Sequence, residues 1–308
     1  MSTIAFIFPG QGSQYVGMGK ELCDHFKVAR EVFEEADDAL GFSISNLCLQ
    51  GPEEELKLTE NTQPAILTTS IAALRVLQTE KGTNPRLAAG HSLGEYSALV
   101  ASGAIPFADA VKTVRLRGRF MQEAVPVGEG AMAAVLGVER GEVEKLCRDV
   151  ANGEVLSPAN FNCPGQIVIA GHASAVQRAI ERVKQNGKKA ILLPVSAPFH
   201  SPLMRPAADR LEKVLEEIQV SDLNIPVVTN VEAEINTSKD RVKPLLVAQV
   251  SKPVLWEESM RRMIREGIEK VLEIGPGRVL SGLMKRIDPA VETRNVEDLQ
   301  SLRKIDSA

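Results

Sequence analysis

The chain has 308 residues, of which 44 % are apolar and 25 % charged, the composition of an ordinary globular protein. Its 36 basic and 40 acidic residues give a net charge of −4, which leaves no general basic field for nucleic acid, and no nucleic-acid partner is expected. The longest apolar runs, 4–8 and 131–138, are too short for a membrane span, and the first residues are not expected to act as a secretory signal. The 4 cysteines form no CxxC pair, which predicts reduced thiols in a cytoplasmic protein without a metal site.

Short apolar runs alternate with amphipathic ones in the first part of the chain. Residues 4–8 are apolar on both faces, which is typical of a central strand in a parallel sheet. Apolar positions spaced by three and four predict a helix over 64–80, with Pro64 in its first turn. A strand at 86–90 and a helix at 95–102 are expected next. This alternation predicts an α/β fold with a mainly parallel sheet.

The middle of the chain follows a different order. The expected elements are a strand at 131–138, a helix at 140–150, strands at 156–161 and 166–170, a helix at 173–185 and a strand at 190–195. The order β-α-β-β-α-β is that of a ferredoxin-like unit, so we interpret 128–197 as an inserted subdomain.

The α/β alternation resumes after this insertion. One helical face is marked at 211–218, and strands are expected at 225–230 and 270–274, the second ended by Gly-Pro-Gly. Residues 1–127 and 198–308 are therefore predicted to form one core around the inserted subdomain.

The sequence Gly-His-Ser-Leu-Gly at 90–94 is the strongest local signal. It is a G-x-S-x-G motif between an expected strand and an expected helix. A sharp turn there brings backbone atoms close, requires glycine on both sides and exposes Ser92 at the positive end of the helix. Ser92 is therefore a candidate nucleophile; a glycine-rich turn with a surface serine is the alternative.

Only 4 histidines could supply the base that such a serine needs. His91 adjoins Ser92, and neighbouring side chains on this kind of turn diverge. His25 lies in an acidic helix and His172 at an expected helix start, which favours surface and capping roles. His200 lies in a proline-bounded loop after a strand, where catalytic groups often lie. We interpret Ser92 and His200 as a nucleophile and its base, against the alternative of a buried loop histidine.

No carboxylate after Ser92 stands in a recognisable context for the third member of a hydrolase triad. A backbone carbonyl that holds the imidazole is the alternative. The loop 9–14 (PGQGSQ) leaves the first strand at the sheet edge where α/β proteins bind ligands. It is suited to present an N–H to an oxyanion, although an ordinary turn would look the same.

Arg115, Arg117 and Arg119 alternate along an expected helix. Successive members differ by about 200° of helix rotation, so they do not all share a face. A solvated basic cluster is the default interpretation, and only a substrate carboxylate would justify a buried member.

Together these motifs resemble those of the malonyl-CoA:acyl carrier protein transacylases of fatty acid synthesis, over almost the whole chain. The matching stretches are FPGQGSQ at 8–14, GHSLGE at 90–95, RGRFMQ at 117–122, NFNCPGQ at 160–166, PFHS at 198–201, EIGPG at 273–277 and NVEDL at 295–299. Cys163 departs from the small residue, such as serine, expected at its position, without affecting the assignment.

The resemblance implies a hydrolase-like α/β core with an inserted ferredoxin-like subdomain, in agreement with the element order. It implies that Ser92 carries the acyl group and that His200 is its general base. The backbone N–H groups of Gln11 and Leu93 would form the oxyanion hole.

Further roles follow from the same resemblance. Arg117 would pair with the malonyl carboxylate, and Gln249 would orient the histidine through its main-chain carbonyl. Phe199 would favour malonyl over methyl-branched units, and Asn160 would line the cleft.

The activity that this implies is transfer of malonyl from malonyl-CoA to the phosphopantetheine thiol of acyl carrier protein, through a malonyl-serine. We expect a cytoplasmic monomer that needs no metal or other cofactor. A serine esterase or thioesterase on the same core is the competing hypothesis, although it predicts an acidic partner for the histidine and no carboxylate-binding arginine. A silent carrier-protein-binding module and malonyl loading for a polyketide pathway are further alternatives.

Overall fold

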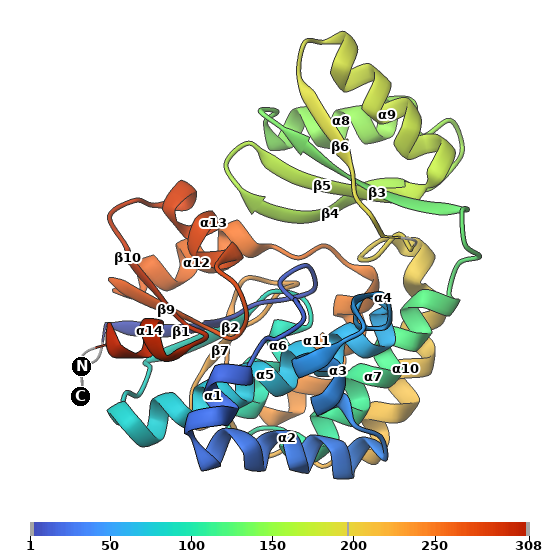
Figure 1. The fold of residues 1–308 in the computed structure, drawn as a ribbon. Coiled ribbons are helices and arrows are strands. Elements are labelled where there is room, and N and C mark those ends of the chain that lie inside the picture. Colours follow the sequence, from blue (N-terminus) through green and yellow to red (C-terminus); the bar gives the residue numbers. More distant parts are fainter. Residues whose placement is uncertain (1–2, 196, 306–308) are drawn as a thin grey trace.

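The computed structural model describes residues 3–195 and 197–305, which form two sheets with their helices (Figure 1). The strands of the larger sheet are β1 (Ile4–Phe8), β2 (Leu87–Gly90), β7 (Val227–Val228), β8 (Ile235–Asn236), β9 (Lys270–Ile274) and β10 (Glu292–Val296). Their order is β10-β9-β1-β2-β7-β8, and every neighbouring pair is parallel except β7 with β8. The predicted mainly parallel α/β fold is confirmed.

Helices cover both faces of this sheet. They are α1 (Lys20–His25), α2 (Lys27–Leu40), α3 (Ile44–Gln50), α4 (Glu53–Leu56), α5 (Thr59–Lys81), α6 (Gly94–Ala101), α7 (Phe107–Glu123), α10 (Arg205–Glu217), α11 (Val242–Ser251), α12 (Trp256–Arg265), α13 (Val279–Ile287) and α14 (Leu299–Arg303), with 3₁₀ turns η1 (Pro202–Met204) and η2 (Lys239–Arg241). Phe6 and Phe8 belong to one buried apolar cluster with side chains of α2, α5 and α7, while Ala5 and Ile7 belong to a second cluster with side chains of α12 and α13. Strand β1 is therefore apolar on both faces because both are buried.

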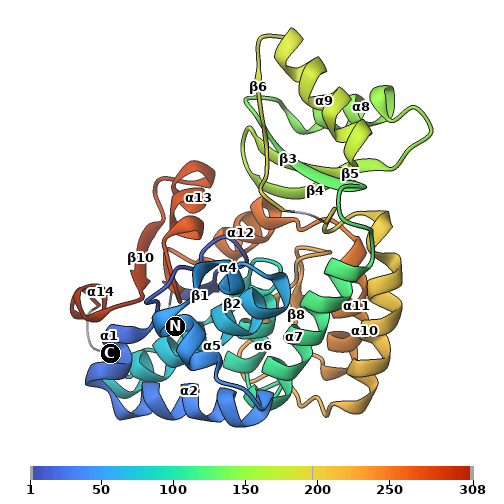
Figure 2. The same cartoon turned by 45° about the vertical axis from the view of Figure 1, so that its right-hand side comes forward.

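The second sheet comprises β3 (Gly130–Leu136), β4 (Leu156–Cys163), β5 (Gln166–His172) and β6 (Lys189–Leu192), in the order β4-β5-β3-β6. All its pairings are antiparallel. Helices α8 (Arg140–Val150) and α9 (Ala173–Gln185) pack on one face of it. The four strands and two helices form a lobe at one end of the core (Figures 1 and 2). This is the predicted ferredoxin-like arrangement.

The division into an inserted unit at 128–197 and a core of 1–127 with 198–308 remains our proposal. Residues 1–2, 196 and 306–308 of these segments lie outside the described part of the chain. Within the described residues, no helix is long and apolar enough to cross a membrane.

The start of α5 differs from the prediction. The helix begins at Thr59, so Pro64 lies inside it and not in its first turn. The proline removes one backbone donor, yet most of α5 is buried, and tertiary packing overrides the local penalty. At Gly118 of α7 an added Cβ would lie 2.5 Å from the Thr59 carbonyl oxygen, so this glycine lets α7 approach the first turn of α5.

Candidate active site

Ser92 lies on a sharp turn between β2 and α6, at the carboxyl end of the parallel strands. Its φ of 52° is in the left-handed region, which L-residues rarely adopt. An added Cβ at Gly90 would lie 1.8 Å from the Gly94 carbonyl carbon, and one at Gly94 would lie 2.1 Å from the Phe8 oxygen. Both glycines of the motif are therefore required by close backbone contact.

The Ser92 hydroxyl donates to His200 Nε2 at 2.8 Å. The imidazole is 4 % exposed, and its Nδ1 donates to the main-chain carbonyl of Gln249 at 2.8 Å. Because Nδ1 carries the proton in that hydrogen bond, the lone pair is on Nε2 and faces the serine. No carboxylate among the described residues hydrogen-bonds to this ring, so a backbone carbonyl stands where a hydrolase triad has an acid.

Arg117 lies beside this pair and is 1 % exposed. Its Nη1 donates to Gln63 Oε1 at 2.8 Å, and its Nη2 donates to Gln249 Oε1 at 2.8 Å and to Ser92 Oγ at 3.1 Å. Its Nε has no partner in the described structure, and burial lowers the pKa of the guanidinium. All its hydrogen-bond partners are neutral, which is unusual for a buried cation because such charges are ordinarily paired.

The two neighbouring arginines on α7 point elsewhere. The Arg115 guanidinium lies 3.9 Å from the centroid of the Phe42 ring. Arg119 forms an exposed ion pair with Glu60 at 3.0 Å. Only Arg117 turns into the protein, as the helical rotation between successive members allows.

The loop that carries Gln11 runs against the Ser92 turn. An added Cβ at Gly10 would lie 2.4 Å from the His91 carbonyl oxygen, so the two backbones are in close contact. The backbone N–H groups of Gln11 and Leu93 have no acceptor among the described residues, and both residues line the same cavity. Two unpaired donors beside a nucleophile are the arrangement that an oxyanion requires.

A cavity of about 120 Å³ connects these groups, with walls from loops and helices of the core and from β3 and β4 of the second sheet. Phe199 and Asn160 lie in its wall, and Asn160 is at the junction where β4 pairs with Val254 of the core. The cavity is lined by Gln11, Gln63, His91, Ser92, Leu93, Arg117, Met121, Met132, Asn160, Leu193, Val195, Phe199 and His200. Of the candidate residues from the sequence, Gln249 alone is outside this lining, and it lies directly behind Arg117 and His200.

Comparison with known proteins decides the family. Residues 5–302 match the family model described as the acyl transferase domain. Over 304 residues the chain is 51 % identical to the malonyl CoA-acyl carrier protein transacylase of Bacillus subtilis, covering 98 % of this chain and 96 % of that protein. The chain belongs to the malonyl CoA-acyl carrier protein transacylases.

Other members of the transacylase family are also similar to this chain in sequence and in structure. The Escherichia coli K12 transacylase is 51 % identical over 288 residues, which is 93 % of each chain. The crystal structure of an acyl carrier protein S-malonyltransferase from Vibrio cholerae superposes with a TM-score of 0.96 at 48 % identity, covering 98 % of this chain and 99 % of that one. A malonyl-transacylase in complex with a type II polyketide synthase acyl carrier protein superposes with a TM-score of 0.96, also at 48 % identity, and covers 98 % of each chain.

The transacylase site also contains three buried residues that the sequence analysis did not single out. Gln63 holds Arg117, and Asn230 contacts the backbone of Ser92. Glu95 accepts from Gln249 Nε2 at 2.7 Å, and burial raises the pKa of this carboxyl to about 7. The glutamate extends the GHSLGE stretch and could have been found there, whereas Gln63 and Asn230 lie in no such motif.

The remaining histidines do not contact Ser92 Oγ. His91 Nε2 lies 2.9 Å from Asn162 Oδ1 and away from the nucleophile. His25 is exposed. His172 precedes α9 as its N-cap residue, and its Nδ1 accepts from the Val155 N–H at 3.0 Å.

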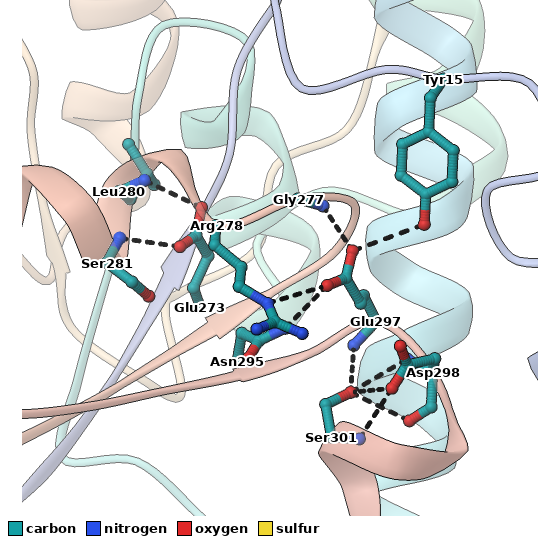
Figure 3. A network of polar contacts seen from close by, with 10 residues as sticks. All are labelled: Tyr15, Glu273, Gly277, Arg278, Leu280, Ser281, Asn295, Glu297, Asp298 and Ser301. Carbon is teal, nitrogen blue, oxygen red and sulfur yellow. Dashed lines mark hydrogen bonds and ion pairs between the residues drawn. The ribbon is translucent and has the colours of Figure 1, made fainter.

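A polar network ties the Gln11 loop of the transacylase to the loop after β9 (Figure 3). The Glu297 carboxylate accepts from the Gly277 N–H at 2.8 Å, from Arg278 Nε at 3.1 Å and from Asn295 Nδ2 at 3.0 Å. The Tyr15 hydroxyl, on the Gln11 loop, donates to the same carboxylate at 3.4 Å. The network therefore joins the loops that follow β1, β9 and β10 at the carboxyl end of the sheet.

Proposed function

We propose that Ser92 carries the malonyl group as an ester while this transacylase moves it from malonyl-CoA to acyl carrier protein for fatty acid synthesis. The observation that carries the proposal is Arg117: a buried guanidinium lies 3.1 Å from the serine oxygen and has only neutral hydrogen-bond partners. A carboxylate is the ligand that completes such a site, because it forms a bidentate, charge-assisted pair with guanidinium. Malonyl differs from acetyl by that one carboxylate.

In the first half-reaction, His200 Nε2 takes the Ser92 proton as the serine oxygen attacks the thioester carbonyl. The oxygen of the tetrahedral intermediate is held by the N–H groups of Gln11 and Leu93. When the intermediate collapses, the C–S bond breaks and the sulfur leaves as the coenzyme A thiol with the proton from His200. The products are coenzyme A and malonyl-Ser92.

In the second half-reaction, the phosphopantetheine thiol of acyl carrier protein gives its proton to His200 and attacks the serine ester. The C–O bond breaks, Ser92 recovers the proton, and malonyl leaves on the carrier thiol. The Gln249 carbonyl accepts from Nδ1 and so holds the imidazole in the tautomer that accepts from the serine. The mechanism therefore needs no acidic residue at this position.

The cavity supports a preference for transfer over hydrolysis. Met121, Met132, Leu193 and Val195 give it apolar walls, which disfavour an ordered water near the ester. A serine esterase would instead have to position an attacking water and would have no use for a buried arginine. We propose that Phe199 and Asn160 shape the acyl pocket, with the phenyl ring limiting the space for a methyl branch.

We propose that the enzyme acts as a cytoplasmic monomer. The cavity and its lining residues are supplied by one chain. All four cysteines are free and buried, as suits a reducing compartment. Size-exclusion chromatography with light scattering tests the monomer.

Arg117→Ala tests the acyl-group preference. We expect malonyl transfer to fall by roughly 30- to several-thousand-fold, because a buried carboxylate left without its partner costs about 2–5 kcal/mol. Acetyl transfer should be unchanged or improved, since acetyl has no charge to pair. The measurement is the ratio of malonyl to acetyl kcat/KM in the wild type and the variant.

Arg119→Ala is the matched control for this experiment, because Arg119 is on the same helix and forms only an exposed ion pair. Its ratio should equal that of the wild type. An unchanged ratio in Arg117→Ala would contradict the assignment of Arg117 as the malonyl-binding residue.

The pH dependence of acylation follows from the burial of His200. Burial, with a smaller contribution from the Arg117 charge, lowers the pKa of this imidazole from 6.5 to about 3. The neutral form, which is the base, therefore persists below pH 6.5, and activity is lost only as pH falls toward the folded-state pKa. We expect the imidazole to contribute no inflection near pH 6.5 to kcat/KM, which reports the free enzyme. The buried Glu95 carboxyl, whose pKa is raised to about 7, titrates close to this range, so the profile is measured in Glu95→Gln as well. A midpoint near 6.5 that persists in Glu95→Gln would mean that the imidazole is solvated.

A further inference from the structure

Asn230 lies directly beneath the Ser92 turn and contacts it with both ends of its carboxamide. It follows β7, the neighbour of β2 in the sheet, and its side chain is 0 % exposed. Oδ1 accepts from the Ser92 N–H at 2.7 Å, and Nδ2 donates to the Gly90 carbonyl at 2.7 Å. One side chain thus bridges the residues on either side of His91.

Among the described residues, neither the Ser92 N–H nor the Gly90 carbonyl forms a hydrogen bond within the neighbouring helix α6. The first bonds of the turn into α6 run from the Gly94 N–H to the His91 carbonyl and from the Glu95 N–H to the Ser92 carbonyl. The Ser92 N–H lies before this series, and its only acceptor among the described residues is Asn230. Since Ser92 has a φ of 52°, its backbone is in a region that persists only when the surroundings impose it.

The carboxamide itself is held in one orientation. The main chain of Asn230 is fixed as well, because its N–H donates to Glu95 Oε2 at 3.3 Å and its carbonyl accepts from the Leu255 N–H at 2.8 Å. The side-chain oxygen faces a donor and the side-chain nitrogen faces an acceptor, so only a carboxamide satisfies both. Aspartate could accept from Ser92 but could not donate to Gly90.

We propose that Asn230 is a positioning residue for acyl transfer: by bridging Gly90 and Ser92 it imposes the backbone conformation that aims Ser92 Oγ at His200. The same hydrogen bond helps to orient the Leu93 N–H, which follows Ser92 directly in the turn. The inference rests on Ser92 being the nucleophile of the proposed function. Asn230 contacts neither Arg117 nor the cavity. Its Oδ1 also accepts a long hydrogen bond from Gln249 Nε2, at 3.5 Å, but Gln249 holds Arg117 through the opposite end of its carboxamide. We therefore expect Asn230 to act on the reactivity of the serine and not on the choice of acyl group.

This placement predicts a specific kinetic signature for Asn230→Ala. We expect the single-turnover rate of acylation to fall by about 10- to 100-fold, the range expected when a reacting group is displaced by about 1 Å. The KM for malonyl-CoA and the malonyl-to-acetyl ratio of kcat/KM should stay at wild-type values. Inactivation by phenylmethylsulfonyl fluoride, a small uncharged reagent for activated serines, should slow by a similar factor. A purely structural role would lower the melting temperature and leave all these rates unchanged.

Asn230→Asp keeps the acceptor for the Ser92 N–H and decides the question if the alanine variant does not fold. We expect it to react more slowly than the wild type, because it loses the donor to Gly90 and places a second carboxylate beside Glu95. Asn236→Ala is the matched control: Asn236 is a buried asparagine of the adjacent strand β8, whose Oδ1 accepts from the Ser238 N–H at 3.1 Å, remote from the nucleophile. Its rates should equal those of the wild type.

Peptide mapping of the acylated residue tests the proposed function separately from the positioning role of Asn230. Malonyl found on a residue other than Ser92 in the wild type would overturn the proposed function. Folded Asn230 variants that acylate Ser92 and react with phenylmethylsulfonyl fluoride at wild-type rates would overturn the positioning role alone.

Discussion

Ser92→Ala is expected to abolish malonyl transfer, with a fall of at least about 10⁴-fold, and to leave the fold intact. The substitution removes the atom that would bond to malonyl, and no other side chain of the cavity combines a hydroxyl or thiol with contact to His200. The fold should survive because the Ser92 backbone keeps its hydrogen bonds to Asn230 and Gln249. The measurement is protein-bound label from radiolabelled malonyl-CoA, with circular dichroism as the check on folding.

Ser97→Ala is the control for this variant. Ser97 is a buried serine on α6, one turn further along, and its hydroxyl has no partner in the described structure. It should retain full activity. Label retained on Ser92→Ala would mean that another residue carries the acyl group.

His200→Ala has the second largest expected effect. Acylation should fall by about 10²–10⁴-fold, the contribution of a positioned general base. The Gln249 carbonyl that holds Nδ1 would remain, but it cannot reach the serine proton. Single-turnover acylation measures this loss directly, without the contribution of product release.

His172→Ala is the matched control, since His172 occupies the N-cap position of α9 in the subdomain, bonds to the Val155 N–H and is remote from the nucleophile. It should acylate at the wild-type rate. If His200→Ala also acylated at that rate, the base would have to be reassigned, and His91 would be tested next.

Much of the fold could be predicted from the sequence because its elements have strong local signals. Residues 4–8 are apolar on both faces, and 140–150 carries a clear helical period; both elements form over those residues. The expected strand at 225–230 is reduced to β7, because the chain leaves the sheet where Asn230 enters the Ser92 turn. The prediction that Pro64 lies in the first turn of its helix is wrong, because it rests on a local rule for helix starts, and the packing of a long buried helix overrides that rule.

The residues of the candidate site likewise differ in whether they carry a local signal in the sequence. Ser92 and His200 lie in short segments whose glycines and prolines indicate a turn and a loop. Helical rotation places Arg117 on the face opposite to Arg115 and Arg119, but it does not say which face is buried, so the burial of Arg117 could not be predicted from it. Gln63 and Asn230 had no signal at all, because their roles exist only once distant segments are brought together.

Intact mass spectrometry after mixing the enzyme with malonyl-CoA tests the central claim, that Ser92 carries malonyl between two thiols. We expect the wild type to retain one malonyl group per chain and to lose it when acyl carrier protein bearing phosphopantetheine is added, with formation of malonyl-carrier protein. Carrier protein without phosphopantetheine should leave the adduct in place, and Ser92→Ala should acquire none. A wild type that acquires no malonyl under conditions where it transfers the group, or an equal adduct on Ser92→Ala, would contradict the account.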